Sequence, residues 1–191
     1  MRVSKEMAAD HRRKILSAAS TMLRERGIER ASVVDLMQAA GLTHGGFYRH
    51  FDSKEALVAE ATTATFKALF ERLEGRAARE GQQAALNKYV AEYLSQRHVE
   101  KPEIGCPIAA YGAEVARESA VVRAAFRDGV DHLLKWISGG LACRGEERDE
   151  KANELLTLMV GAIVTARTMG DRTRSREILA CARRRAESLA R

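Results

Sequence analysis

The sequence predicts an all-α fold of about nine helices, for three reasons. Good helix formers such as alanine, leucine, glutamate and arginine dominate the 191 residues, and runs of β-branched residues are scarce. Aromatic residues make up 5% of the chain, and its two prolines are Pro102 and Pro107. Apolar residues recur at helical spacing throughout, with no convincing strand alternation or internal repeat. With 46% hydrophobic and 30% charged residues, the chain is expected to be globular, with one large or two small domains.

The first two helices are predicted from an apolar stripe and a cap. The stripe of the first helix consists of Ile15, Ala18, Ala19, Met22 and Leu23. Gly27 is well placed to end this helix, because glycine readily adopts the left-handed conformation that follows many helices. Ser32 is the expected N-cap of the second helix, with Asp35 at the acidic position of the capping motif. This helix ends near Ala40, and Gly41 makes the turn.

Two further helices are expected after the turn. Thr43 is the expected N-cap of a short helix that ends around His50 or Phe51, and Ser53 is the N-cap of a long one. The apolar stripe of the long helix consists of Leu57, Ala61, Ala64, Phe66, Leu69, Phe70 and Leu73. This helix is predicted to link the first domain to the second. The polar, charged residues from Gly75 to Gly81 are expected to form a connector.

The same spacing predicts the rest of the chain. One helix has a stripe formed by Leu86, Tyr89, Val90, Tyr93 and Leu94. A loop is expected from His98 to Gly105, and Pro107 suits the first turn of the helix that follows. Ser119 is expected to cap another helix, which frays at Gly139-Gly140. The last two helices are predicted over Glu147–Met169 and Ser175–Ala190.

The segment from Ser32 to Phe51 is the most informative part of the sequence. Two short helices around a tight glycine turn form a helix-turn-helix, whose second helix enters the major groove of DNA. Its small core is predicted to consist of Leu36, Met37, Leu42, Phe47 and Phe51. Gly45-Gly46 disfavours a helix by roughly 1 kcal/mol per residue relative to alanine. Close approach of the backbone to DNA is one reason for glycine there, and a plain loop is the alternative.

The distribution of charge supports two domains with different partners. Residues 1–54 hold 10 Lys/Arg against 6 Asp/Glu, residues 55–171 hold 15 against 18, and residues 172–191 hold 7 against 2. A basic first domain before a mildly acidic middle suits a DNA-binding domain over 1–54 and an effector-binding domain over 55–191. The basic run Arg183-Arg184-Arg185 is interpreted as a solvated face.

Residues Gly41 to Leu57, GLTHGGFYRHFDSKEAL, resemble the signature of the TetR family of bacterial transcriptional regulators. The resemblance covers about residues 10–60 and implies that the donor side chains of this segment contact DNA phosphates or, at the start of the second helix, the groove. Where the family often has lysine after the cap, this chain has His44, which weakens one charge contact. The predicted DNA-binding residues are Ser32, Thr43, His44, Gly45, Tyr48, Arg49, His50 and Lys54.

The resemblance further implies a ligand-responsive regulator, a repressor that a small-molecule effector releases from a palindromic double-stranded DNA operator. It also implies a homodimer formed through the last two helices, where Gly161, Ala162, Ala166, Ala182 and Ala186 allow close helix approach. The alternative is that these stripes face only the core of their own chain. A transcriptional activator or a non-specific nucleoid-type binder would have a similar first domain.

The middle helices are expected to enclose the effector. Candidate lining residues are Phe66, Phe70, Tyr89, Tyr93, Cys106, Tyr111, Phe126 and Trp136, with Glu114 as a polar anchor. Plain core packing is the alternative for each of them. Cys106 stands at an expected helix start, where the dipole favours a thiolate, so a redox- or electrophile-sensing thiol competes with a small buried cysteine.

Several classes of protein are disfavoured. No nucleophile elbow, Walker loop, dinucleotide fingerprint or HExxH motif occurs, so the chain is not expected to be an enzyme or to hold a cofactor or metal. Three widely spaced cysteines argue against a disulfide framework. The start lacks the apolar core of a signal peptide and no stretch suits a membrane span, so a cytoplasmic location is expected.

Overall fold

The computed structural model describes residues 5–143 and 145–190, and helices are the regular secondary structure throughout these ranges. We call the part before α3 the head; it contains α1 (Lys5–Arg30), α2 (Val33–Ala39) and the 3-10 helix η1 (His44–Arg49). We call the remainder the body. Its elements are α3 (Lys54–Glu80), α4 (Gln82–Tyr93), α5 (Gln96–Glu100), the 3-10 helix η2 (Pro102–Ile104), α6 (Pro107–Val115), α7 (Ala120–Gly140), α8 (Glu146–Thr168) and α9 (Arg172–Leu189).

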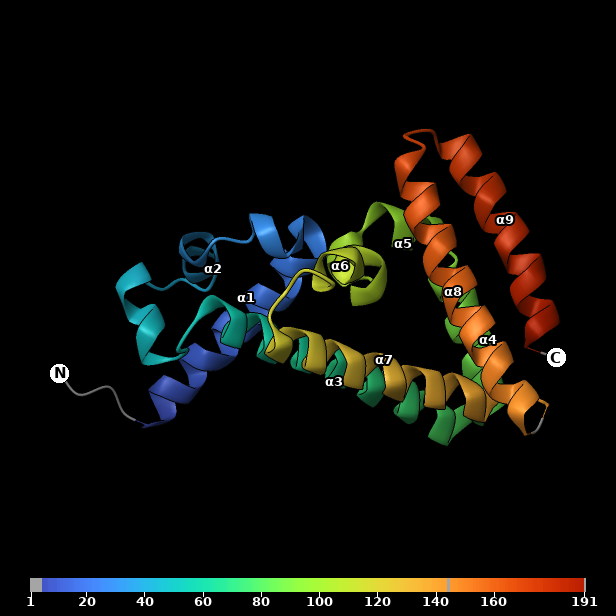
Figure 1. Cartoon of the computed structure of the whole chain (residues 1–191), viewed down its shortest axis with the longest axis horizontal. Helices are drawn as coiled ribbons and strands as arrows, with labels where there is room; N and C mark the ends of the chain where they lie inside the picture. The colour runs from blue at the N-terminus through green and yellow to red at the C-terminus, as the bar shows by residue number, and fades with distance from the viewer. Residues whose placement is uncertain (1–4, 144, 191) are drawn as a thin grey trace.

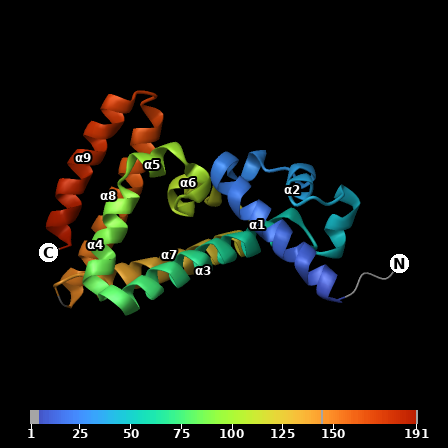
Figure 2. The same ribbon diagram turned by 180° about the vertical axis from the view of Figure 1, so that it is seen from behind.

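The molecule is elongated, with the head at one end and the α8–α9 pair at the other (Figure 1). The helices α3 and α7 lie side by side along the length of the body, and α8 and α9 pack against each other. Seen from behind, α5 and α6 follow α4 and lead the chain back toward α1 (Figure 2). The buried side chains of these helices belong to one hydrophobic core. The predicted all-α fold is therefore confirmed.

Local caps account for where several helices begin. The Ser32 hydroxyl accepts the backbone N–H of Asp35 at 3.1 Å, and the Ser53 hydroxyl accepts that of Ala56 at 3.1 Å. Pro107 occupies the first turn of α6, as predicted. Thr43 and Ser119 precede η1 and α7, but neither side chain makes a capping hydrogen bond.

Two predicted connections are wrong. The segment from Gly75 to Gly81 is not a connector, because α3 continues to Glu80 and the chain turns only at Gly81, where φ is 86°. The residues around Gly75 are good helix formers, and Arg76 holds the extra turns by pairing with Glu92 of α4 at 2.8 Å. The predicted loop from His98 to Gly105 instead contains most of α5 and all of η2.

Contacts around Gly27 join the head to the body. Gly27, the predicted end of the first helix, has φ of 82° and interrupts α1, but three more helical residues follow it. The Glu114 carboxylate of α6 accepts the N–H groups of Ile28 and Glu29 at 2.7 and 3.0 Å. A side chain at residue 27 would place its Cβ 2.1 Å from this carboxylate, so both the backbone angle and the contact require glycine there.

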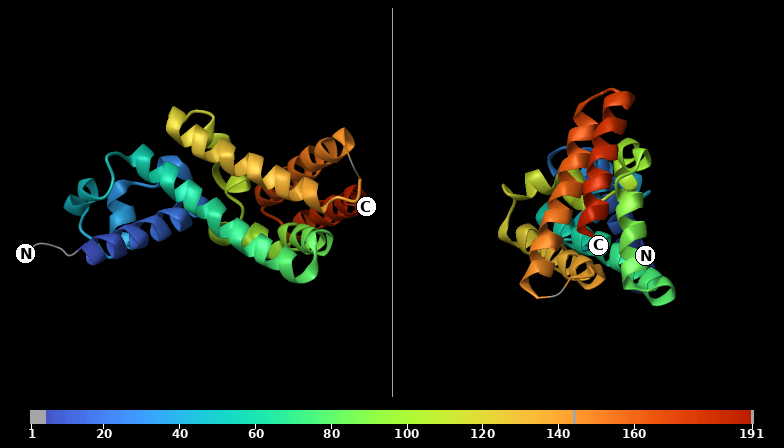
Figure 3. Two further views of the ribbon diagram at one scale, coloured as in Figure 1. Left: turned by 90° about the horizontal axis from the view of Figure 1, so that it is seen from below. Right: turned by 90° about the vertical axis from the view of Figure 1, so that its right-hand side faces the viewer.

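The head also packs on the beginning of α3. The Ser20 hydroxyl donates to the Ala61 carbonyl at 3.2 Å, and Leu57, Val58 and Ala61 are buried. Seen from below, α3 runs without a break from the head into the body (Figure 3). The predicted domain boundary between residues 54 and 55 therefore separates α3 from its N-cap, Ser53. This boundary stays a prediction. No helix within the described ranges is long and apolar enough to cross a membrane.

Candidate nucleic-acid interface

The two short helices of the head are held at an angle by a small apolar core. Leu36, Met37, Phe47 and Phe51 are buried, as predicted, whereas Leu42 is only half-buried. Gly41 makes the turn with φ of 71°, and the Leu42 N–H donates to the Met37 carbonyl at 2.8 Å. This core and turn fix the direction in which the next element points.

That next element, η1, is a 3-10 helix of six residues. The sequence predicts a short helix here, and the tighter form agrees with the low helix propensity of the consecutive Gly45 and Gly46. One side of η1 is anchored, because Phe47 is fully buried and contacts the rings of Tyr48 and Phe51 at 5.2 and 5.9 Å.

The other side of η1 faces solvent with polar groups. The exposed residues are Thr43, His44, Gly45, Tyr48 and Arg49, all from the predicted set. The Tyr48 side chain is 70% exposed, although it is a large aromatic residue. This exposure leaves both the ring and the hydroxyl accessible to a partner. Gly45 has no atom within 4 Å of the place where a Cβ would stand, so its backbone is open to close approach.

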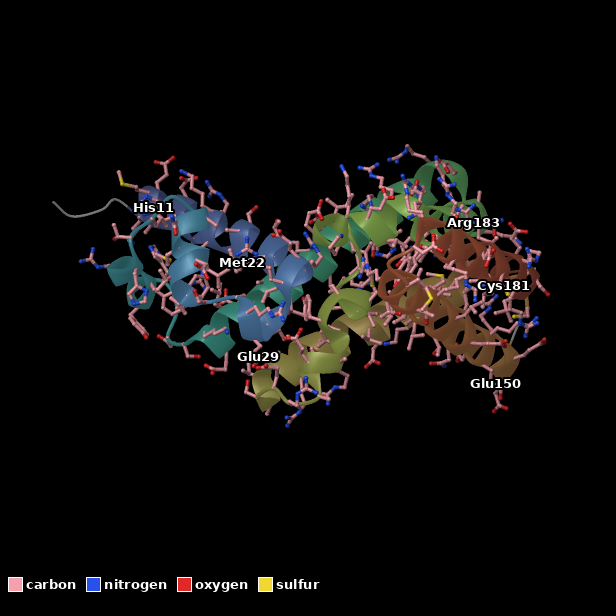
Figure 4. All side chains as sticks on the ribbon, turned by 90° about the horizontal axis from the view of Figure 1, so that it is seen from above. His11, Met22, Glu29, Glu150, Cys181 and Arg183 are labelled. Carbon is pink, nitrogen blue, oxygen red and sulfur yellow. The ribbon has the colours of Figure 1, made fainter. Side chains whose placement is uncertain are left out.

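His50 lies at the edge of this exposed face. It is half-buried, and its ring is 6.0 Å from that of His11, which Figure 4 places on α1 at the head end. Burial lowers the pKa of His50, and the neighbouring His11, Arg12 and Arg49 lower it further. At neutral pH the imidazole is therefore neutral and can offer a phosphate one N–H donor.

Arg12 is a functional residue of the head that the sequence prediction missed. Its guanidinium donates to the His50 carbonyl and to the Glu60 carboxylate, and it lies 4.3 Å from the centre of the Phe51 ring. It therefore ties α1, the end of η1 and α3 together. Sequence periodicity gives no signal for this role, because the partners are 38 and 48 residues away.

Lys54 and Ser32 are partly engaged within the head itself. The Lys54 ammonium donates to the carbonyls of Ile28 and Glu29 at 2.7 and 3.5 Å and so caps the end of α1. The Ser32 hydroxyl caps α2 and also donates to the Asp35 carboxylate at 2.6 Å. The predicted phosphate roles of both residues stay predictions.

The predicted effector residues lie in the centre of the body, with one exception. Eight of the nine are buried there. Their rings form a network of contacts, such as Phe66 with Phe126 at 5.7 Å and Tyr89 with Trp136 at 5.6 Å. The exception is Glu114, whose carboxylate turns toward α1.

Two open cavities lie outside this aromatic centre. One of about 330 Å³ lies between the end of α1, the start of α3 and α6, and Glu114 is the one predicted effector residue that lines it. Another of about 300 Å³ lies between α4 and α9, and none of the predicted effector residues lines it. Among the described residues, no group of three or more His, Cys, Asp or Glu side chains could hold a metal ion.

Cys106 is buried beside His98. The Cys106 N–H donates to Nε2 of His98 at 3.0 Å, and Nδ1 of His98 is 2.8 Å from the Tyr93 carbonyl. His98 thus accepts through Nε2 and donates through Nδ1, and burial lowers its pKa to about 4. Burial also raises the pKa of the Cys106 thiol, which opposes the thiolate that the helix start was expected to favour.

Comparisons with known proteins point to one family. Residues 15–61 match the family described as bacterial regulatory proteins, tetR family. Over 59 residues the chain is 41% identical to the HTH-type transcriptional repressor KstR2 of Rhodococcus jostii, a match that covers 31% of this chain and 29% of that protein. It is 38% identical over 58 residues to the HTH-type transcriptional regulator TtgR of Pseudomonas putida, covering 30% and 28%. The matches thus span less than a third of these relatives' length.

Solved structures resemble the chain over nearly its whole length. The reduced form of Escherichia coli NemR has a TM-score of 0.78 at 23% identity, covering 95% of this chain and 97% of that one. A TetR transcriptional regulator from Legionella pneumophila has a TM-score of 0.80 at 16% identity, covering both chains fully. FadR from Bacillus subtilis, solved with stearoyl-CoA, has a TM-score of 0.70 at 16% identity, covering 93% and 97%. At these identities the likeness concerns the fold alone.

Proposed function

Because the chain belongs to the TetR family of bacterial regulatory proteins, we propose that it represses transcription by binding a palindromic DNA operator, from which a small-molecule effector releases it. The observation that carries this proposal is the exposed polar face of η1, held in place by the buried Phe47. Such a short element on a rigid base suits insertion into the major groove.

The DNA contacts fall into two groups in this proposal. Thr43, His44 and Gly45 approach the base edges, where the missing side chain of Gly45 lets the backbone come close. Donor groups around them bind phosphates, which position the protein without reading sequence. The phosphate-binding residues in this scheme are Ser32, Tyr48, His50 and Lys54, with Arg49 at either a base or a phosphate.

The proposal includes a homodimer formed through α8 and α9. Ala162, Ala166, Ala182 and Ala186 pack within their own chain, since all four are buried. The outward face of the second half of α8, residues 157–168, is different: Gly161 is exposed with open space around it, and Val164 is 43% exposed. An uncharged, partly apolar helix face supports close packing against a second copy. Two heads would then reach successive major grooves about 34–36 Å apart.

The basic run of α9 makes contacts within the body, and we do not propose it as a second DNA-binding site. Figure 4 shows Arg183 and Cys181 at the end of the molecule opposite the head. The Arg183 guanidinium donates to the Leu94 carbonyl at 2.8 Å, and Arg185 pairs with Glu154 of α8. The basic run was expected to be a solvated face, but two of its three arginines bind groups of the same chain.

Helix α6 is suited to carry an effector signal to the head. One side of it reaches the centre of the body through Tyr111, and Glu114 holds the end of α1. Next to α6, the Glu103 carbonyl accepts from Arg24 of α1 at 2.7 Å. An effector that binds better to one position of α6 would shift the population of head orientations.

Footprinting of the DNA beside the protein's own gene tests the proposal. We expect a palindromic protected site at low salt and affinity that falls steeply as salt rises, because phosphate contacts release counterions. Binding without a preferred site would favour a nucleoid-type protein instead. A site whose occupation raises transcription would favour an activator, and failure to bind any of this DNA would overturn the regulator function.

A further inference from the structure

Three buried polar atoms in the centre of the body have no nitrogen or oxygen atom as hydrogen-bond partner. They are the hydroxyls of Tyr89 and Tyr93 on α4 and the indole Nε1 of Trp136 on α7. The three side chains are 4%, 4% and 7% exposed. The Tyr89 ring lies 5.7 Å from that of Tyr93 and 5.6 Å from that of Trp136, so the three rings that carry these atoms form one cluster. Unpaired buried polar groups are costly and rare, and three in one place call for an explanation.

The neighbouring polar groups have hydrogen-bond partners, so the lack of partners is confined to this cluster. The Tyr111 hydroxyl, also buried, pairs with that of Thr62 at 3.2 Å. Both ring nitrogens of His98 have partners. The Tyr93 hydroxyl has one sulfur partner, the Cys106 thiol, and a hydrogen bond to sulfur is weak.

The chemistry of the cluster determines what it could bind. The indole N–H of Trp136 can donate but cannot accept. Burial raises the pKa of both Tyr89 and Tyr93 well above the usual value, so both phenols keep their protons and can donate. The surroundings are aromatic, which suits an apolar body attached to one or more acceptor oxygens.

A charged ligand suits the cluster less well. A buried carboxylate needs a cation or several donors to offset its lost hydration. Two guanidinium groups influence the cluster electrostatically. That of Arg72, which acts on Tyr89, belongs to an exposed residue. That of Arg167, which acts on Tyr93 and Cys106, already donates to the carbonyls of three residues. These residues are His98, Val99 and Ala109.

We propose that Tyr89, Tyr93 and Trp136 form the polar end of a ligand site for neutral, apolar carbonyl compounds, whose oxygen accepts hydrogen bonds from these donors. The regulatory meaning of this site rests on the proposed function above. The binding chemistry itself does not, because it concerns only the cluster between α4 and α7.

Two probes of nearly the same shape test the proposal by calorimetric titration of the full chain. Acetophenone carries a carbonyl oxygen, and α-methylstyrene has a methylene group in its place. Burial of apolar surface alone favours α-methylstyrene, which is the more hydrophobic of the two. We expect acetophenone to bind about tenfold more tightly, because only its oxygen satisfies the donors.

Three variants test whether the preference for acetophenone over α-methylstyrene comes from the cluster. The double variant Tyr89→Phe/Tyr93→Phe keeps both rings and should reduce the preference to within about twofold. Its Tm should be unchanged or higher, since it removes two unsatisfied groups. The matched control Tyr111→Phe should keep the preference and lower the Tm, because it breaks the pair with Thr62. A variant Trp136→Phe should weaken acetophenone binding in the same direction as the double variant.

The proposal is overturned if the two probes bind equally, if α-methylstyrene binds more tightly, or if neither binds. It is also overturned if the double variant lowers the Tm, which would show that the hydroxyls are already satisfied. Operator binding is measured in parallel without probe and should be the same for wild type and double variant. Loss of DNA binding in the wild type would contradict the regulator function and leave the probe result to stand on its own.

Discussion

His98 illustrates how its surroundings set the protonation state of a single side chain. Its ring is buried, both nitrogens are paired, and its pKa falls from 6.5 to about 4. Between these values the unfolded chain binds a proton that the folded chain does not, so stability decreases as the pH falls. We expect His98 to account for a loss of about 3 kcal/mol between pH 7 and pH 4.

Urea unfolding at pH 7, 5.5 and 4 measures this loss. The variant His98→Gln offers one amide donor and one acceptor but does not titrate. It should be less stable than the wild type at pH 7 and lose less stability on acidification. Identical pH slopes for the two proteins would show that His98 does not contribute to the acid sensitivity.

Lys54 has a structural and a predicted DNA-binding role, which one substitution separates. We expect Lys54→Ala to lower the free energy of unfolding by about 1 kcal/mol, because the ammonium no longer caps the carbonyls of Ile28 and Glu29. It should also weaken binding to all DNA alike, since phosphates carry no sequence information. Urea unfolding and fluorescence anisotropy with operator and unrelated duplexes give the two readouts.

Tyr48→Phe serves as the comparison for Lys54→Ala. The Tyr48 side chain is 70% exposed, so loss of its hydroxyl should leave stability unchanged and weaken DNA binding without changing specificity. An effect of either substitution on the operator alone would assign that residue to base recognition instead of phosphate binding.

At the scale of one element, η1 contains two consecutive glycines although glycine has a low helix propensity. A Cβ at Gly45 would meet no atom within 4 Å, and one at Gly46 would lie 3.6 Å from Met37, an ordinary contact. Neither residue has a positive φ. Nothing within the fold therefore requires glycine at either position, and close approach to DNA is our proposed reason for glycine at the exposed one.

This reasoning predicts different outcomes for the two glycines. Gly45→Ala and Gly46→Ala should each leave the Tm unchanged or raise it, because alanine is the better helix former. Gly45→Ala should lower operator affinity about tenfold through the added methyl group on the groove face, whereas Gly46→Ala should have little effect. Equal affinities of the two variants in a gel-shift titration would refute close backbone approach at residue 45.

At the scale of the whole molecule, the long α3 and the contacts of α6 join the two ends of the chain. The head is held to the body by the pairing of Glu114 with the backbone of Ile28 and Glu29. At the opposite end, the second half of α8 presents an uncharged face with Val164 and Gly161 exposed. Assembly at that end would fix the separation of two heads.

We expect Val164→Arg to convert the proposed dimer to a monomer, because two buried arginines would face each other across a symmetric interface. Operator affinity should then fall by about tenfold or more, since the two heads no longer bind together. Val121→Arg is the matched control, because Val121 is 54% exposed at the start of α7, away from α8 and α9. Sedimentation velocity measures the mass, and an unchanged mass for Val164→Arg would contradict this interface.

The sequence by itself determined the helical class, most helix positions and the helix-turn-helix. These depend on local interactions: the caps of Ser32 and Ser53 act over three residues, and apolar stripes repeat every three or four. The exposure of Tyr48 and burial of Phe47 also follow from periodicity around a short helix.

The tertiary structure alone decided how the side chains are shared between head and body. Arg12, Lys54 and Glu114 find partners 26 to 86 residues away, so no local pattern could show their roles. The pairing of Arg76 in α3 with Glu92 in α4 is likewise non-local, because the two residues are 16 apart in the sequence. The missing hydrogen-bond partners around Tyr89, Tyr93 and Trp136 are also set by tertiary structure. Burial and hydrogen bonding there depend on helices that meet only after the chain has folded.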